Sequence, residues 1–165
     1  MNILDQFFSV RIFYLLLIIF ISCEEAALPI DEEGTPLSVD TVSLRKLIDY
    51  LLDNGVHGIW AAGTTGEFAS LSVEEQLTVI ETVVDQVAGR VPVIANISRA
   101  STDLSLDMAI MTQHLGLDGI AATPPYYYPH SQDELISHYR YLHNKTELPL
   151  WIYHIPRTVK TTVMP

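Results

Sequence analysis

The segment Gly63-Thr64-Thr65-Gly66-Glu67 has the residue types of a turn that binds a small anion. It follows Ile59-Trp60-Ala61-Ala62, a run that is apolar on both faces and typical of a buried strand. The two glycines can adopt backbone angles closed to other residues, so the main chain can approach a ligand closely. The two threonines add hydroxyl and N–H groups, which suit a carboxylate. An ordinary tight turn has the same composition, so the flanking sequence decides between the two interpretations.

Polar and aromatic residues that could do chemistry recur after the later apolar runs of the chain. Those with functional character are Thr64, Thr65, Asn96, Tyr126, Tyr127 and Tyr153. Each falls at the carboxyl end of a predicted strand, and in parallel barrels these ends surround one mouth. We therefore expect these side chains to lie around one site.

The elements that must position these residues are strands alternating with helices. Strands are predicted over residues 56–62, 91–97, 117–122 and 148–153, with one helical pattern in each interval. A further helix is predicted over residues 38–53, before the first of these strands. Its apolar stripe consists of Leu44, Leu47, Ile48, Leu51 and Leu52. This alternation predicts a parallel sheet covered by helices.

The helices between the strands begin at recognisable capping residues. Ser72 with Glu75 and Ser131 with Glu134 form capping boxes, in which each serine starts a helix. Ser101 precedes the remaining helix. The residues that this third helix is expected to bury are Leu104, Met108, Met111 and Leu115.

Two parallel architectures fit the alternation, the doubly wound sheet and the (β/α)₈ barrel. The glycine-rich turns do not follow GxGxxG, and the functional residues are spread over several strand ends instead of one switch point. This distribution favours the barrel. A full barrel takes about 250 residues, so a chain of 165 residues corresponds to its first half. The predicted fold class is therefore α/β, a partial barrel with roughly its first five strands.

The composition argues against several kinds of partner. Nine Lys and Arg residues against 20 Asp and Glu give a formal net charge of −11, which repels the phosphates of a nucleic acid. Cys23 is the only cysteine, so neither a disulfide framework nor a cysteine-based metal site is expected. The six histidines show no HExxH motif or paired spacing, and no metal site is expected.

The first 28 residues form a hydrophobic leader that allows three interpretations. Residues 12–21 are an unbroken apolar run, closer to the ~7–15 residues of a signal-peptide core than to the ~20 of a transmembrane helix. Asp5 accompanies Arg11, so the amino end lacks the usual positive charge. An export signal or anchor, a buried strand, and an artefact of an incomplete gene model all remain open.

Three segments, in order and at suitable spacing, resemble the dihydrodipicolinate synthase and N-acetylneuraminate lyase family. They are Gly63-Thr64-Thr65-Gly66-Glu67 with residues 70–75, Thr123-Pro124-Pro125-Tyr126-Tyr127, and Tyr153-His154-Ile155-Pro156. The similarity covers residues 29 to about 160. Members of this family are Schiff-base-forming aldolases with a (β/α)₈ fold. The resemblance implies that residues 29–165 are the N-terminal half of such a barrel.

The resemblance also implies roles for individual residues. Thr64 and Thr65, with Gly66 in the same turn, would bind the carboxylate of pyruvate or another 2-keto acid. Tyr153 would relay protons to and from the Schiff base. Tyr127 would reach into a neighbouring subunit's site and join that relay through Thr65. No cofactor is implied, and the complete enzyme is expected to be a homo-oligomer, a dimer or tetramer.

The sequence departs from the family pattern at one catalytic position and at one substrate-binding position. The family's imine-forming lysine lies at the end of the sixth strand, which we expect to be absent here. The lysines of the chain are Lys46, Lys145 and Lys160, none at a predicted strand end, and Lys160 is a poor substitute nucleophile. Arg157 is a counterpart of the synthases' carboxylate-binding arginine but stands one position earlier.

The predicted function is that of a pyruvate-type lyase or aldolase related to dihydrodipicolinate synthase, present as an inactive fragment. Its substrates would be a 2-keto acid and an aldehyde, with aspartate semialdehyde, N-acetylmannosamine and sugar-acid aldehydes all open as acceptors. The alternatives are an N-acetylneuraminate lyase, a 2-keto-3-deoxy sugar acid aldolase or dehydratase, and a non-catalytic half-barrel that binds other proteins. The expected location is the cytoplasm, or a membrane or the exterior if residues 7–23 are a genuine anchor or signal.

Overall fold

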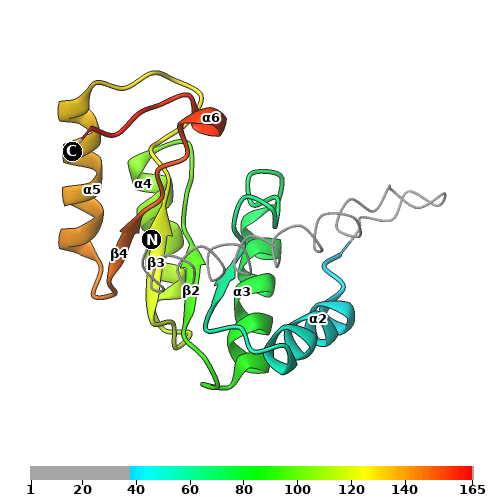
Figure 1. Cartoon of the computed structure of the whole chain (residues 1–165). Helices are drawn as coiled ribbons and strands as arrows, with labels where there is room; N and C mark the ends of the chain where they lie inside the picture. Colours follow the sequence, from blue (N-terminus) through cyan, green and yellow to red (C-terminus); the bar gives the residue numbers. More distant parts are fainter. Residues whose placement is uncertain (1–37, 165) are drawn as a thin grey trace, which may run out of the picture.

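The computed structural model describes residues 38–164, which form one parallel sheet with helices packed against it (Figure 1). The four strands are β1 (Ile59–Ala61), β2 (Val93–Asn96), β3 (Gly119–Ala122) and β4 (Leu150–Ile152). They pair in sequence order, and every neighbouring pair is parallel. The predicted parallel α/β arrangement is therefore confirmed. The hydrophobic leader, and the further strand expected before β1, lie outside the described residues.

The three helices between the strands occupy the predicted intervals and begin at the predicted caps, Ser72, Ser101 and Ser131. The bounds of the helices are α2 (Thr41–Asp53), α3 (Val73–Val87), α4 (Thr102–Thr112), α5 (Gln132–Lys145) and the short α6 (Pro156–Val159). Both capping boxes are formed, at Ser72 with Glu75 and at Ser131 with Glu134. Helix α2 begins three residues later than predicted, because the Asp40 carboxylate caps it by accepting from the N–H groups of Val42 and Ser43.

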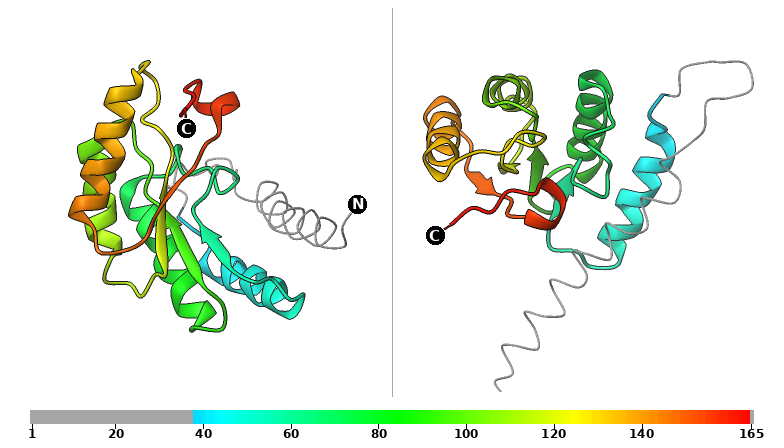
Figure 2. Two further views of the ribbon diagram at one scale, coloured as in Figure 1. Left: turned by 60° about the vertical axis from the view of Figure 1, so that its left-hand side comes forward. Right: turned by 90° about the horizontal axis from the view of Figure 1, so that it is seen from above.

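The helices lie along one face of the sheet, as in the wall of a barrel. Helices α3, α4 and α5 stand side by side outside the strands (Figure 2), and each contacts the next. Helix α2 packs against α3. Because all neighbouring strands are parallel, their carboxyl ends lie at the same edge of the sheet. No helix within residues 38–164 is long and apolar enough to span a membrane.

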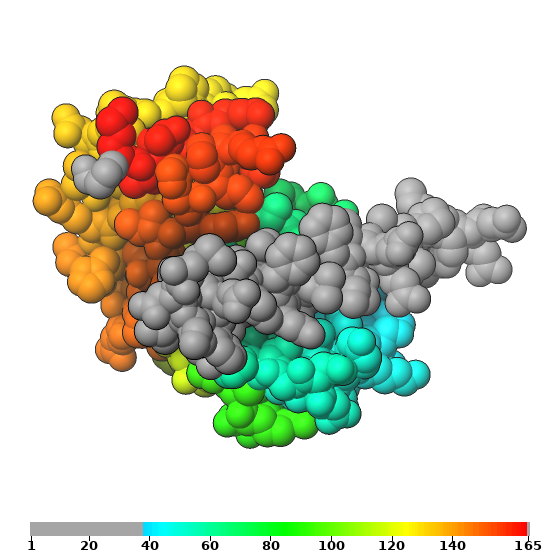
Figure 3. Space-filling model, viewed as in Figure 1, coloured from blue at the N-terminus to red at the C-terminus, as the bar shows by residue number. Residues whose placement is uncertain are grey.

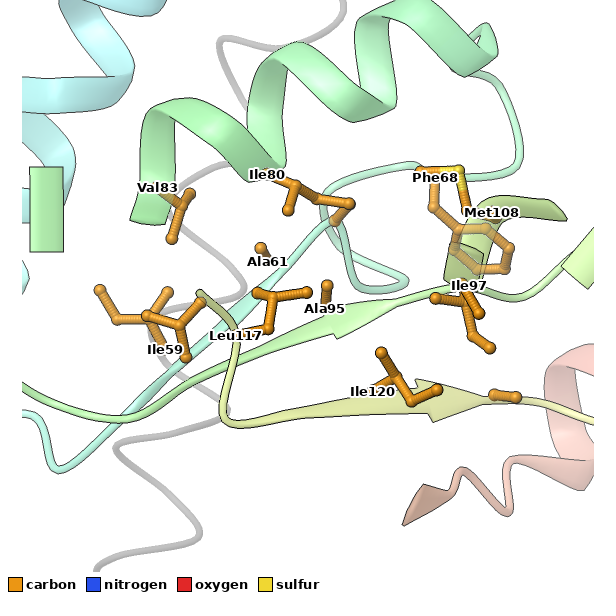
Figure 4. Close-up of a cluster of buried hydrophobic side chains, with 14 of the residues drawn as sticks. Ile59, Ala61, Phe68, Ile80, Val83, Ala95, Ile97, Met108, Leu117 and Ile120 are labelled. Atoms are coloured by element: carbon orange, nitrogen blue, oxygen red, sulfur yellow. The ribbon is translucent and has the colours of Figure 1, made fainter. Parts of the chain in front are cut away.

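The hydrophobic core fills the space between the sheet and its helices (Figure 4). Alternate residues of each strand face it, for example Ile59 and Ala61 of β1 and Ile120 of β3. Ile80 and Val83 meet them from α3. The predicted strands began two or three residues too early, because loop residues such as Val56, Val91 and Leu148 also pack against the core. A run of apolar residues indicates which residues are buried. A strand begins only where the backbone also forms hydrogen bonds with a neighbouring strand.

Helix α4 faces the core differently from the prediction. Met108 is buried, as expected, but 53% of Leu104 and 43% of Met111 remain exposed. The helix packs instead through Ser105, Met108, Ala109 and Thr112. The buried hydroxyls of Ser105 and Thr112 donate to the backbone carbonyls of Ser101 and Met108, one turn earlier in the chain. The prediction that Leu104 and Met111 point inward was therefore wrong.

Candidate active site at the carboxyl ends of the strands

The turn after β1 places Thr64 and Thr65 at the mouth of the sheet. The residues with positive φ are Ala62 and Glu67, both at 50°, and neither Gly63 nor Gly66 lies in that region. The conformational freedom expected of the two glycines is therefore not what the turn uses. A Cβ on Gly66 would lie 3.4 Å from both the Ala62 Cα and the Gly63 carbonyl oxygen, so glycine allows the turn to close on itself.

Tyr153 enters the same region from the end of β4. Its N–H donates to the Ala122 carbonyl of β3 at 2.8 Å, and this hydrogen bond fixes the backbone from which the Tyr153 side chain extends. The Thr64 hydroxyl donates to the Tyr153 hydroxyl at 3.3 Å. Trp60 of β1 packs edge-on against the Tyr153 ring, with centroids 4.5 Å apart. The structure thus brings together the predicted carboxylate-binding turn and the predicted proton-relay tyrosine.

The tyrosines after β3 divide into an inner and an outer residue. Tyr126 packs edge-on against Phe68 with centroids 6.0 Å apart, and burial raises the pKa of its phenol while Arg99 acts in the opposite direction. Tyr127 is 85% exposed and has φ of 85°, which is strained for a residue with a Cβ. It touches the Tyr128 ring edge-on at 4.9 Å. Tyr127 therefore points away from the site of its own chain.

A cavity of about 290 Å³ lies between the turn after β1, the loop after β3 and α6. Its lining residues are Thr64, Glu67, Phe68, Ala69, Ser70, Thr123, Tyr126, Ile155, Thr158 and Val159. Arg157 is exposed and is not in this lining, although it was predicted to bind substrate. Thr158, the next residue, lies there instead, because one residue along a helix turns the side chain by about 100°.

A chain of buried hydrogen bonds supports the floor of this region. Gln76 donates to the Asn96 carbonyl at 2.8 Å, and the Ser98 hydroxyl donates to Asn96 Oδ1 at 2.6 Å. The Ser98 hydroxyl also accepts from the Thr123 N–H at 2.8 Å. All four residues are at most 2% exposed. Of these four residues, only Asn96 was predicted from the sequence to have functional character. Thr123 could have been predicted as well, because it begins the Thr-Pro-Pro-Tyr-Tyr segment.

A second cavity, of about 630 Å³, lies between the start of α4 and α5. Buried in its wall is His138, whose Nδ1 lies 2.8 Å from the Thr102 hydroxyl. Burial lowers the pKa of His138 to about 4, and a charged His130 acts in the same direction. The remaining ionisable lining residues are Asp103, Asp133, Glu134 and Tyr141. Within residues 38–164 no cluster of three or more His, Cys, Asp or Glu side chains could hold a metal ion.

The fold and the site together define a class of protein. Parallel strands, outer helices and functional side chains at the carboxyl ends are the features of an enzyme barrel of the (β/α)₈ type. The residues at its mouth are hydroxyls and phenols, suited to binding a carboxylate and to moving protons.

Comparison with known proteins identifies the family. The sequence model of the dihydrodipicolinate synthetase family matches residues 25–164, and the chain belongs to this family. It is 38% identical over 128 residues to the 4-hydroxy-tetrahydrodipicolinate synthase of Pelobacter propionicus, covering 78% of this chain and 44% of that protein. For the Bacillus subtilis synthase the identity is 39% over 132 residues, covering 79% and 44%. The chain thus spans less than half the length of these curated relatives.

Solved structures agree with the assignment. A chloride-inhibited dihydrodipicolinate synthase from Acinetobacter baumannii, complexed with pyruvate, superposes with a TM-score of 0.74 at 33% identity, covering 76% of this chain and 44% of that one. A prophage protein of the dihydrodipicolinic acid synthase family from E. coli K12, also in complex with pyruvate, gives 0.73 at 29% identity, covering 76% and 42%. Residues 38–164 are therefore part of a (β/α)₈ barrel, as the sequence predicted.

Proposed function

We propose that this chain supplies the carboxylate-binding and proton-relay part of a lyase or aldolase site. The reaction would join or cleave pyruvate, or a similar 2-keto acid, and an aldehyde through a Schiff base. The observation that carries the proposal is the 3.3 Å hydrogen bond between the hydroxyls of Thr64 and Tyr153 at the mouth of the strands. Relatives solved with pyruvate support the choice of keto acid.

The geometry gives Thr64 and Tyr153 distinct tasks. Because the Tyr153 oxygen accepts from Thr64, its own proton is available to a substrate atom in front of it. The edge-on Trp60 ring holds the phenol in place. The hydroxyl in contact with Tyr153 is that of Thr64, the first threonine of the turn. A role for Thr65 in the relay stays a prediction, as do carboxylate binding by Thr65 and Gly66 and the role of Tyr127.

Formation of the Schiff base requires a desolvated lysine amine next to the keto acid. Of the chain's lysines, Lys160 is nearest in sequence to the site, but it is exposed and its amine donates to the Arg157 carbonyl at 2.8 Å. Lys46 lies in α2 and Lys145 ends α5. We therefore propose that this chain by itself does not form the imine and is inactive.

The test combines covalent trapping with a binding measurement. Borohydride reduction in the presence of pyruvate should leave the intact mass of the purified chain unchanged. In a ¹⁵N-labelled chain, pyruvate should shift the amide signals of Thr64 and Thr65, whereas acetone, which lacks the carboxylate, should not. A reduced adduct mapped to Lys160 would refute the inactivity, and unshifted turn amides would refute carboxylate binding.

One observation favours a second function, an interaction protein built on an open sheet. Trp151 and Ile152 of β4 are 61% and 51% exposed, and β1 and β4 each have one unpaired edge within the described sheet. Exposed apolar residues beside an unpaired strand edge favour association. Homo-oligomer formation, with Tyr127 at the contact, is part of the same proposal. Sedimentation of the wild type and of Tyr127→Ala separates contact through this tyrosine from contact through β4.

The cytoplasmic location expected from the resemblance also stays a prediction. Fractionation of cells that express the whole chain tests it, because a genuine anchor in residues 7–23 would place the protein with the membranes.

A further inference from the structure

Trp60 is the middle residue of β1, and its side chain lies on the face of the sheet opposite the helices. Its neighbours Ile59 and Ala61 belong to the hydrophobic core between the sheet and the helices. Because side chains alternate along a strand, Trp60 is turned to the other, inner face of the sheet. On that face a large side chain can reach residues that come from other strands.

The indole of Trp60 lies directly beside the turn after β1. A Cβ added to Gly63, the residue before Thr64, would lie 3.9 Å from both Cδ2 and Cε2 of the indole. This is an ordinary van der Waals distance, so the ring already supports the first residue of the turn. The groups that we propose to bind the keto-acid carboxylate therefore follow a residue that the indole holds in place.

The same indole contacts Tyr153 from the other side of the site. The two ring centroids are 4.5 Å apart and the ring planes are inclined by 73°. The segment after Tyr153 lies beside the loop after β3 (red and yellow in Figure 3), where Gln132 donates to the Thr162 carbonyl at 2.8 Å. That hydrogen bond and the one from the Tyr153 N–H to Ala122 hold the backbone. The edge-on indole, in contrast, orients the phenol ring itself.

The span between the two outer strands explains why a large side chain is needed here. β1 and β4 are separated by β2 and β3, and three strand spacings of about 4.8 Å place their backbones roughly 14 Å apart in a flat sheet. Curvature shortens this span, and the indole fills the space that remains between the turn and the Tyr153 ring. The hydroxyls of Thr64 and Tyr153 then meet at 3.3 Å.

We propose that Trp60 is a positioning residue of this site, acting through the turn after β1 and through Tyr153. Its ring holds the carboxylate-binding turn and the proton-relay phenol at a fixed separation, without itself contacting the keto acid. This inference rests on the proposed function, because the two groups that Trp60 positions are the ones to which that function assigns pyruvate binding and proton transfer.

The first test is a pyruvate titration of the whole ¹⁵N-labelled chain, followed at the amide signals of Thr64 and Thr65. Trp60→Leu should weaken pyruvate binding about tenfold, because leucine is too short to support both the turn and Tyr153. Trp60→Phe keeps an aromatic ring and should bind within about threefold of the wild type. Trp151→Phe is the matched control and should leave the affinity unchanged, since its indole lies beside Gly119 of β3. Equal affinities of Trp60→Leu and the wild type would overturn the inference.

A spectroscopic test leaves Trp60 in place and so does not depend on the folding of a Trp60 variant. The chain has two tryptophans, and Trp151→Phe leaves Trp60 as the remaining one. Pyruvate should change the fluorescence of this chain with the same midpoint as the amide shifts of Thr64 and Thr65. Trp60→Phe, which retains Trp151, should show no such saturable change. Constant Trp60 fluorescence while the turn amides shift would contradict the proposal.

A measurement without ligand separates this inference from the proposed function. The energetic coupling between Thr64→Val and Tyr153→Phe in urea unfolding should fall at least about twofold in the Trp60→Leu background, but not in the Trp60→Phe background. A residue that only stabilised the fold would lower the overall stability and leave this coupling unchanged, and that result would refute the positioning role. Turn amides of the wild type that do not respond to pyruvate would instead count against the proposed function.

Discussion

The Thr64 hydroxyl lies 3.3 Å from the Tyr153 hydroxyl, although the two residues are 89 positions apart in the chain. The contact joins the turn after β1 to the end of β4, the two outer strands of the described sheet. Because the pair spans the sheet, it depends on the curvature of all four strands. A change in this contact would therefore indicate a change in the curvature of the sheet and in the proposed site.

We predict an energetic coupling between Thr64 and Tyr153. In a double-mutant cycle of Thr64→Val and Tyr153→Phe, urea unfolding should show a coupling of about 0.5–1 kcal/mol, the range for one partly buried hydrogen bond. Thr65→Val is the matched control. The same cycle with Thr65→Val should show coupling near zero, and a larger value there would transfer the relay partnership to Thr65.

Ser98→Ala should destabilise the chain by about 2–3 kcal/mol, because it leaves Asn96 Oδ1 and the Thr123 N–H buried without their partner. Ser137→Ala, on the exposed face of α5, should change the free energy of unfolding by less than about 0.5 kcal/mol. Urea denaturation of both variants tests this. Equal effects would mean that the buried chain of hydrogen bonds does not hold the loop after β3.

His138 should make the fold sensitive to mild acid. Its folded pKa of about 4 lies below the ordinary value of 6.5, so between these pH values the unfolded chain binds more protons than the folded one. Stability from this group is therefore complete above pH 6.5 and is lost as the pH falls towards 4. The loss should reach at most about 3 kcal/mol, since each pKa unit corresponds to about 1.4 kcal/mol.

The measurement is the pH dependence of urea unfolding for His138→Gln against the wild type. The variant should lose less stability between pH 6.5 and 4, because it cannot take up a proton on unfolding. His143→Gln changes an exposed histidine on the same helix and should leave the slope as in the wild type. Parallel slopes for the wild type and His138→Gln would contradict the assignment.

The effect of a substitution in α4 on the free energy of unfolding should depend on whether the residue is buried in the structure, and not on whether it belongs to the apolar pattern of the sequence. Met108→Ala, at a residue 1% exposed, should cost about 2–5 kcal/mol through the cavity it leaves. Leu104→Ala, at a residue 53% exposed, should cost less than about 1 kcal/mol. Chemical denaturation distinguishes them, and a large cost at Leu104 would show that this side chain is covered in the folded protein in solution.

Much of the fold could be predicted because its signals are local. Capping boxes at Ser72 and Ser131 lie within one helical turn, and each was found where the sequence indicated. The alternation of strand and helix patterns determines a parallel sheet, since consecutive parallel strands need a crossover between them. The placing of Tyr153 and the Thr64-Thr65 turn at one edge of the sheet follows from this topology.

The sequence by itself thus determined the element order, the helix starts and the edge at which the site lies. Only the tertiary structure decided that Thr64 meets Tyr153, that Thr158 replaces Arg157 in the cavity wall, and that Leu104 stays exposed. In each case the outcome depends on the direction in which one side chain points from its helix or turn, and this direction differs between adjacent residues. Local pattern specifies an element and its approximate face, but only long-range packing fixes which side chains touch.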